Sequence, residues 1–221
     1  MKLPHDSGPI YKETLMTRFP VEPFNTLSNL LFLAILIYFG IKVYRNPKKH
    51  MFITCTLPVI FIGYVGGTIY HATRSAEIWL YMDWVPIMLS CLAATIYFIF
   101  KSTSSVWQRI LWIGLTLVIN IGERLLPIPK KYVISIGYIL TAIGVLLPIF
   151  VYLYKTHWVQ TKWIIFSILS FALAISFRIL DKHLDFLTMG THWLWHTFGA
   201  IAVFFLITYI YKDDITKPAK N

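Results

Sequence analysis

Seven long apolar runs alternate with short polar segments along the chain, and they constrain its fold more than any other feature. About 20 mostly apolar residues cross the hydrocarbon core of a bilayer as one helix. By that length, the predicted spans are residues 24–44, 51–71, 78–100, 106–122, 132–154, 161–180 and 191–211. We therefore predict an all-α integral membrane protein built as a bundle of seven transmembrane helices.

The composition agrees with a membrane protein. Of the 221 residues, 57% are hydrophobic and 14% are charged, whereas about 25% of the residues of a soluble domain are charged. The net charge of +10 would suggest nucleic-acid binding in a soluble protein. Here the lysines and arginines lie in the short segments between apolar runs, where they set membrane topology and contact lipid headgroups. We therefore predict a membrane partner and no nucleic-acid partner.

The chain has no linker or internal repeat, so we expect a single membrane domain over residues 1–221. It comprises an N-terminal segment (1–23), the seven spans (24–211) and a C-terminal tail (212–221). The N-terminal segment lacks the apolar core of a cleavable signal peptide, so the first span is expected to direct membrane insertion. Lysine and arginine are slightly more numerous on the side of the C-terminus, which predicts a cytoplasmic C-terminus and an N-terminus on the opposite face.

Each ionisable residue within a membrane span costs roughly 2.5–3.5 kcal/mol to insert, so its presence needs a reason. His71 ends the second span, Asp83 lies in the first turns of the third, and His192 and His196 begin the seventh. Because successive spans alternate in direction, all four reach a similar depth near the N-terminal side. His192 and His196 are four residues apart and share one helix face. We predict that the four residues form one intramembrane site.

Three neutral imidazoles with an open fourth position match a catalytic zinc site, with His71, His192 and His196 as ligands. Bound zinc lowers the pKa of its water to about 7. Asp83 can then accept a proton from that water or orient a ligand histidine. The alternative is that these histidines bond to the backbone or lie among the headgroups. The other histidines lie in predicted loops or tails and are expected in solvent: His5, His50, His157 and His183.

Further polar residues lie on the same side of the membrane as the predicted site. Glu22, Asn25 and Asn29 share one face of the first helix, where they either cap and pack the helix or support the metal ligands. Arg178 and Asp181 are three residues apart and can pair across one turn. The same two interpretations, structural pairing and support of the ligands, apply to this pair.

Small and hydroxyl residues precede the first histidine. Gly66 and Gly67 lie about one turn before His71 and allow either close helix packing or space beside the metal for a lipid carbonyl. Thr68 lies three residues before His71 on the same face. Its hydroxyl either binds a substrate oxygen or bonds back to its own helix.

Several segments together resemble the alkaline ceramidase family, within a superfamily of seven-span metal hydrolases that includes the progestin and adipoQ receptors. They are VEPFNTLSNLLF, GGTIYHATRS with MDWVP, and FRILD followed by GTHWLWHTFGA, and they extend from Glu22 to Ala200. The resemblance implies a zinc-dependent amide hydrolase that cleaves ceramide to a sphingoid base and a fatty acid. It also implies that His71, His192 and His196 are the zinc ligands and that Asp83 is the acidic catalytic residue.

The chain departs from this family pattern at one position. Members carry a serine four residues before the first histidine, and this chain has Gly67 there. Thr68, the next residue, is the candidate to supply the missing hydroxyl. If no hydroxyl is supplied at this place, the resemblance favours the alternative function. That alternative is an adipoQ-receptor-like lipid-binding or signalling protein with little or no hydrolase activity.

The resemblance also implies a second cofactor. Animal ceramidases of this family bind calcium through an acidic N-terminal segment and the acid before the first helix. Glu22 matches that last acid, and Glu13 is a looser match within the segment. A calcium site at Glu13 and Glu22 is therefore a further expectation.

Overall fold

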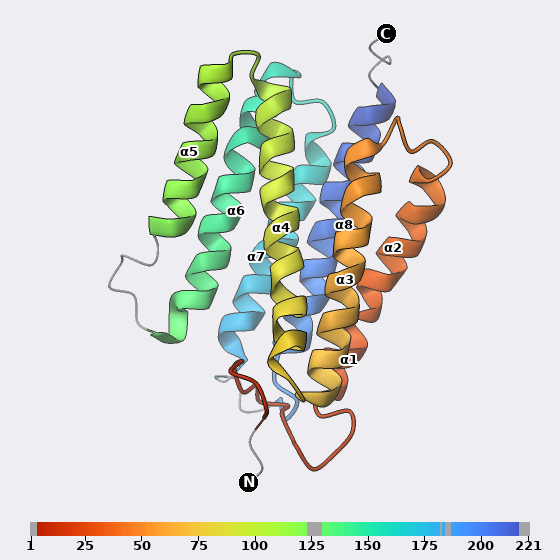
Figure 1. Cartoon of the computed structure of the whole chain (residues 1–221), viewed down its shortest axis with the longest axis vertical. Coiled ribbons are helices and arrows are strands. Elements are labelled where there is room, and N and C mark those ends of the chain that lie inside the picture. The colour runs from red at the N-terminus through yellow and green to blue at the C-terminus, as the bar shows by residue number, and fades with distance from the viewer. Residues whose placement is uncertain (1–3, 123–129, 182, 184–186, 217–221) are drawn as a thin grey trace. The chain divides into compact units, whose positions relative to one another are not determined.

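The regular structure of the protein is entirely helical in the residues that its computed structural model describes, which are 4–122, 130–181, 183 and 187–216 (Figure 1). The helices are α1 (Pro23–Ser28), α2 (Leu30–Val43), α3 (Met51–Thr73), α4 (Glu77–Ser102), α5 (Val106–Gly122), α6 (Lys130–Lys155), α7 (Thr161–Leu180) and α8 (His192–Thr216). The predicted all-α fold class is confirmed.

Six stretches of helix are long and apolar enough to cross a membrane. They are Pro23–Val43, which combines α1 and α2, and Met51–Thr73, Glu77–Ser102, Tyr132–Lys155, Thr161–Leu180 and His192–Thr216. The predicted span at 106–122 corresponds to α5, a shorter apolar helix. The chain is therefore a multi-span helical membrane protein. Helix α8 ends at Thr216, beyond the predicted end at residue 211, and the rest of the tail lies outside the described residues.

The first span is interrupted at Asn29, between α1 and α2. Pro23 begins α1, where its fixed φ suits the first turn. The Thr26 hydroxyl donates to the Glu22 carbonyl (2.7 Å), and the Ser28 hydroxyl donates to the Asn25 carbonyl (2.8 Å). Asn29 keeps helical backbone angles, so α2 continues in nearly the same direction. The polar stripe of the first span lies in and beside α1, which contacts both α3 and α8.

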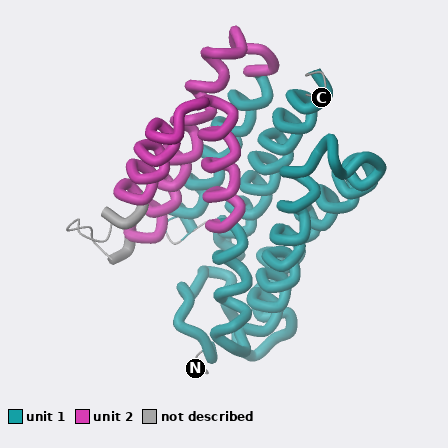
Figure 2. The backbone as a smooth tube through the Cα atoms, turned by 45° about the horizontal axis from the view of Figure 1, so that its top comes forward, with its two compact units in different colours: residues 1–87, 162–221 teal, residues 88–161 magenta. Residues whose placement is uncertain are grey.

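The described chain divides into two compact units (Figure 2). The first contains residues 1–87 and 162–221, and the second contains residues 88–161. Within the second unit, the Ser102 hydroxyl donates to the Pro148 carbonyl (3.1 Å), and the Lys155 ammonium donates to the Ser102 carbonyl (2.7 Å). All the residues predicted for the functional site lie in the first unit. The single domain that we expect from the sequence stays a prediction.

Helices α3 and α4 approach closely in the first unit because Gly66 has no side chain. A Cβ atom at Gly66 would lie 2.6 Å from the backbone carbon and 2.8 Å from the backbone oxygen of Met82. Backbone atoms cannot move aside cheaply, so this helix contact requires glycine. The contact holds the end of α3, with His71, against the start of α4, with Asp83. This is the packing role predicted as one alternative for Gly66.

His50 corrects one expectation from the sequence. Its side chain was expected in solvent, but His50 is buried at the start of α3. Its Nδ1 atom lies 3.3 Å from Asp214 Oδ2, and its ring stacks on Tyr211 with centroids 4.6 Å apart. The segment between α2 and α3 turns this histidine against the last turns of α8, a tertiary contact that no local pattern indicates.

Candidate metal centre

Three histidines converge at one end of the first unit. His71 lies in the last turn of α3, and His192 and His196 lie in the first two turns of α8. One potential ligand atom from each residue lies within 4.8 Å of the other two. The Nε2 atoms of His192 and His196 are 3.1 Å apart. All three side chains are buried, so the structure brings together the histidines that the sequence predicted to share a site.

Two of the rings are held through their outer nitrogens. His71 Nδ1 lies 2.5 Å from Glu22 Oε2, and His196 Nδ1 lies 2.9 Å from Asn29 Oδ1. A carboxylate and an amide oxygen only accept hydrogen bonds, so each Nδ1 carries the proton. In the neutral imidazole, the lone pair is then on Nε2, which faces the other histidines. Metal-binding histidines are typically oriented by this kind of outer contact.

Two ring nitrogens of the cluster lack a partner, and one of them fits a metal site. His71 Nε2 and His192 Nδ1 are buried, and neither has a hydrogen-bond partner among the described residues. A buried nitrogen without a partner is costly, and nearly all such atoms in proteins are satisfied. A metal ion that accepts the His71 Nε2 lone pair would remove that cost. Imidazole donors suit zinc and other transition ions, whereas calcium prefers oxygen ligands.

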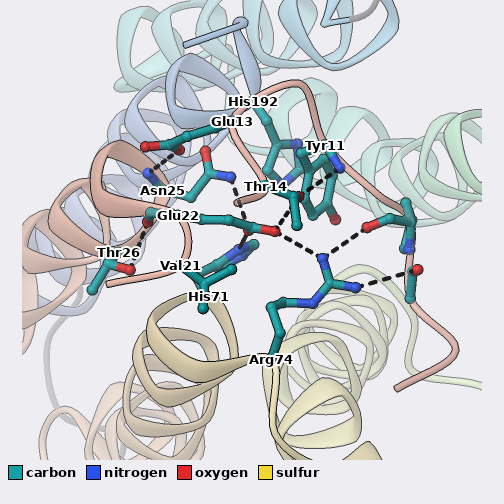
Figure 3. Close-up of polar contacts among 12 residues, drawn as sticks. Tyr11, Glu13, Thr14, Val21, Glu22, Asn25, Thr26, His71, Arg74 and His192 are labelled. Carbon is teal, nitrogen blue, oxygen red and sulfur yellow. Dashed lines mark hydrogen bonds and ion pairs between the residues drawn. The ribbon is translucent and has the colours of Figure 1, made fainter. Parts of the chain in front are cut away.

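Glu22 lies at the centre of the hydrogen-bond network around this cluster (Figure 3). Besides His71, its fully buried carboxylate accepts from Thr14 Oγ1 (2.5 Å), Asn25 Nδ2 (3.1 Å) and Arg74 NH1 (2.7 Å). Burial alone would raise the pKa of Glu22. The hydrogen bonds from His71 and Thr14 and the charge of Arg74 outweigh burial and lower that pKa to about 2. Glu22 is therefore ionised at neutral pH.

Arg74 anchors the segment before α1 to the end of α3. We call residues 4–22 the N-terminal strap. The buried guanidinium donates to both carboxylate oxygens of Asp6 (2.9 and 2.6 Å) and to the carbonyls of Gly8 and Pro9. Burial opposes the charge, but the carboxylates of Asp6 and Glu22 raise the pKa of Arg74 above its ordinary value. Sequence reasoning counted Arg74 only as a topology charge and missed this role.

Tyr11 of the strap packs against two of the three histidines, His71 and His192 (Figure 3). Its ring stacks on His192 with centroids 3.7 Å apart and planes 18° apart. The same ring lies tilted against His71, with centroids 5.6 Å apart. Sequence reasoning missed Tyr11 because a single tyrosine in a loop belongs to no periodic pattern.

Asp181 positions the start of α8. Its Oδ1 accepts from the backbone N–H groups of Thr191 (2.8 Å) and His192 (2.9 Å), and its Oδ2 accepts from the backbone N–H of Lys12 (3.1 Å). A carboxylate at a helix N-terminus also suits the helix dipole. Asp181 thereby joins the strap to the helix that carries two of the histidines. Arg178, the other residue predicted with it, lies over the Trp195 ring, with Cζ 5.2 Å from the centroid.

Asp83 lies against Gly67, beside the Asn29 amide. A Cβ atom at Gly67 would be 2.4 Å from Asp83 Oδ1 and 3.3 Å from Asn29 Nδ2. Since Asn29 bonds to His196, the carboxylate lies next to a residue that orients a candidate ligand. The Thr68 hydroxyl donates to the Tyr64 carbonyl (2.7 Å), which is the bond within its own helix that we predicted as the alternative to a substrate contact.

Glu13 and Glu22 each bind protein donors. Glu13 accepts from the backbone N–H of Phe24 and from that of Asn25 (3.0 Å), and so caps the start of α1. Burial raises the pKa of Glu13, although these two N–H groups and Arg18 act in the opposite direction. A calcium ion at these two residues would have to compete with those donors and with Arg74. The calcium site stays a prediction.

Comparisons with known proteins identify no family. No protein-family model matches the sequence, and a search of the curated proteins finds no match. The fold and site therefore define a class only, a multi-span helical membrane protein with a buried three-histidine cluster that can hold a metal ion. The ceramidase-like assignment enters as a proposal.

Proposed function

We propose that the protein is a zinc-dependent hydrolase within the membrane that cleaves the amide C–N bond of ceramide or a related lipid amide. The products are a sphingoid base and a fatty acid. The observation that carries the proposal is the convergence of His71, His192 and His196, with two outer nitrogens held by Glu22 and Asn29. The resemblance to alkaline ceramidases supports the choice of reaction.

An apolar groove near the cluster supports a lipid substrate. It encloses about 410 Å³ between α2 and α8 and is lined by Leu31, Ala34, Ile35, Tyr38, Ala200, Ile201 and Phe204. Ala200 lies one turn after His196, and Leu31 follows shortly after Asn29. An acyl chain in this groove would therefore end near the histidines.

Each residue of the site has a separate role in the proposed hydrolysis. Zinc held by three imidazoles would supply Lewis-acid activation of water and of the amide carbonyl. Glu22 and Asn29 keep the ligand rings oriented, and Tyr11 covers His192. Asp83 takes the proton of the attacking water and returns it to the leaving amine nitrogen as the C–N bond breaks. Water adds across the amide bond, and one acid and one amine are released.

The experiment combines metal analysis with lipid turnover. Purified protein should contain about one zinc per chain and release sphingoid base and fatty acid from ceramide in a mixed lipid pool. Asp83→Ala should retain zinc and lose at least about 100-fold in turnover, in the range of general acid–base contributions. His157→Ala, which removes an exposed histidine, should keep both properties. Full turnover in His196→Ala would disprove the proposal.

The alternative is an adipoQ-receptor-like protein that binds a lipid without hydrolysing it. Two observations favour it: residue 67 carries no hydroxyl, and the Thr68 hydroxyl is bonded to its own helix. In that case, wild-type protein would contain zinc and bind lipid saturably, but would release no product from amide-linked or ester-linked lipids.

The proposal includes an orientation. We propose that the C-terminus is cytoplasmic, following the distribution of lysine and arginine, and that the histidine cluster lies toward the opposite face. Cysteine labelling from each side of the membrane would test this orientation. A C-terminal label accessible only from outside would reverse it.

A further inference from the structure

A second cavity lies at the end of the first unit that is farthest along α8 from the histidines. It encloses about 300 Å³ and is lined by Tyr38, Phe39, Lys42, Trp163, Phe204, Thr208, Tyr211, Lys212 and Ile215. Lys212 is sixteen residues after His196, which is about 24 Å along a helix. The cavity is therefore separate from the candidate metal centre.

Two lysines give this cavity its charge. Lys42 Nζ lies 4.1 Å from the centroid of the Tyr38 ring and 5.4 Å from that of Tyr211. Lys212 Nζ lies 5.5 Å from the centroid of the Trp163 ring. Both lysines are half-buried, and the cavity lining includes no acidic residue. The aromatic rings attract the ammonium groups but do not neutralise them.

The position of the cavity matches a membrane interface. Lys42 lies in the last turn of α2, Lys212 near the end of α8 and Trp163 in the first turn of α7. Tryptophan, tyrosine and lysine at the ends of membrane helices typically lie at the level of the lipid headgroups. A basic pocket between helices at this level is suited to anionic headgroups.

The cavity also adjoins the apolar groove between α2 and α8. Tyr38 and Phe204 line both spaces. The cavity is cationic and the groove is apolar, which matches the headgroup and the acyl chain of an anionic phospholipid. A soluble anion would use only the cavity.

We propose that this cavity binds an anionic phospholipid, with its phosphate between Lys42 and Lys212 and one acyl chain in the α2–α8 groove. The ammonium groups and the Thr208 hydroxyl can donate hydrogen bonds to phosphate oxygens. The lining of this cavity includes none of His71, His192 and His196, so headgroup binding there requires neither zinc nor hydrolysis. The acyl chain would occupy the same α2–α8 groove that we propose for the substrate.

The headgroup part of the proposal can be tested by native mass spectrometry of the full chain. The protein would be released from nanodiscs that contain equal amounts of phosphatidylglycerol and phosphatidylcholine. Wild type should retain phosphatidylglycerol preferentially. Each of Lys42→Gln and Lys212→Gln should weaken that retention about fivefold. Lys162→Gln is the matched control, since Lys162 Nζ also lies near Trp163 (5.4 Å) but does not line the cavity.

The acyl-chain part can be tested with the lysines intact. Ala34→Trp should fill the groove and reduce phosphatidylglycerol retention at least about fivefold, whereas Ile37→Trp, on an exposed position of α2 outside the lining, should not. The unfolding midpoint serves as the folding control for every variant. Equal retention of both lipids by wild type, or unchanged retention in the Lys42→Gln, Lys212→Gln double variant, would overturn the proposal. Loss of retention in the lysine variants but not in Ala34→Trp would also overturn it, because a headgroup or free phosphate alone would explain that result.

Discussion

The two ends of the first unit each bury a histidine beside a tyrosine and a carboxylate, yet only one end forms a candidate metal centre. At one end, His192 stacks on Tyr11 and His71 bonds to Glu22. At the other, His50 stacks on Tyr211 and bonds to Asp214. The difference is convergence, because three rings meet at the first end and one lies at the second. A buried histidine with an acidic partner is therefore insufficient to indicate a metal.

The two ends also differ in how charge is balanced. Arg74 is enclosed by the carboxylates of Asp6 and Glu22. Lys42 and Lys212 lie against aromatic rings in a cavity without a lining carboxylate. The first end completes its own ion pairs, and the second offers positive charge to a partner from the membrane.

The largest effect should come from removing His71, compared with removing His50 at the other end. His71→Ala should reduce bound zinc from about one per chain to less than about a tenth, because two imidazoles are too few for a tight site. His50→Ala should keep zinc at the wild-type level. Elemental analysis of the purified variants measures both. Equal zinc loss in the two variants would remove the distinction between the ends.

Arg74→Met should give the next largest effect. It leaves Asp6 and Glu22 buried without their partner, which destabilises a protein by about 3–5 kcal/mol. Hydrogen exchange should increase across the strap, residues 4–22, and the unfolding midpoint should fall. Arg45→Met, at an exposed position near the other end, should change the free energy of unfolding by no more than about 0.5 kcal/mol. An unchanged strap in Arg74→Met would refute the anchoring role.

Asn29→Ala should weaken zinc binding without abolishing it. The variant loses the oxygen that accepts from His196 Nδ1, and loss of such a contact typically lowers metal affinity about 10–100-fold. Competition with a chelator of known affinity measures the change. Asn46→Ala, which removes an exposed asparagine near the opposite end, is the control. Wild-type affinity in Asn29→Ala would show that His196 needs no orienting partner.

The smallest effect concerns the helix starts at the two ends. Glu13 caps α1 from the strap, whereas α3 begins at the other end without a side-chain cap. Because the pKa of Glu13 is raised in the folded protein, the folded state binds more protons than the unfolded state above the ordinary value of 4.5. Glu13 therefore makes the free energy of unfolding fall as the pH rises from 4.5 to the raised pKa of this carboxyl group. Glu13→Gln should remove that part of the decline, measured as unfolding midpoints at several pH values. An unchanged pH dependence would contradict the raised pKa.

Much of the fold was predictable because apolar runs of span length leave few alternatives. The predicted span 161–180 coincides with α7. The convergence of His71 with His192 and His196 followed from alternating helix direction, which fixes depth without any knowledge of side-chain contacts. The interruption at Asn29 was not predicted, because hydropathy over a whole span does not register a break at one residue.

The surroundings of the site were less predictable than its centre. Tyr11 and Arg74 act through contacts between segments that are at least 52 residues apart in sequence. Asp181 was predicted either to pair with Arg178 or to support the ligands, and no local pattern indicated that its carboxylate would bind backbone N–H groups at the start of α8. His50 was expected in solvent and is buried. These features depend on loop paths, which periodicity does not encode.

Gly67 has a consequence for how this protein can change over evolution. A side chain at position 67 would occupy the place now taken by the Asp83 carboxyl. Rotation of that flexible side chain is the cheapest way to make room. Substitutions at positions 67 and 83 should therefore be coupled, so that the order in which they arise decides which intermediates retain function. If a residue with a hydroxyl group replaces Gly67, the side chain of Asp83 must adopt a different rotamer.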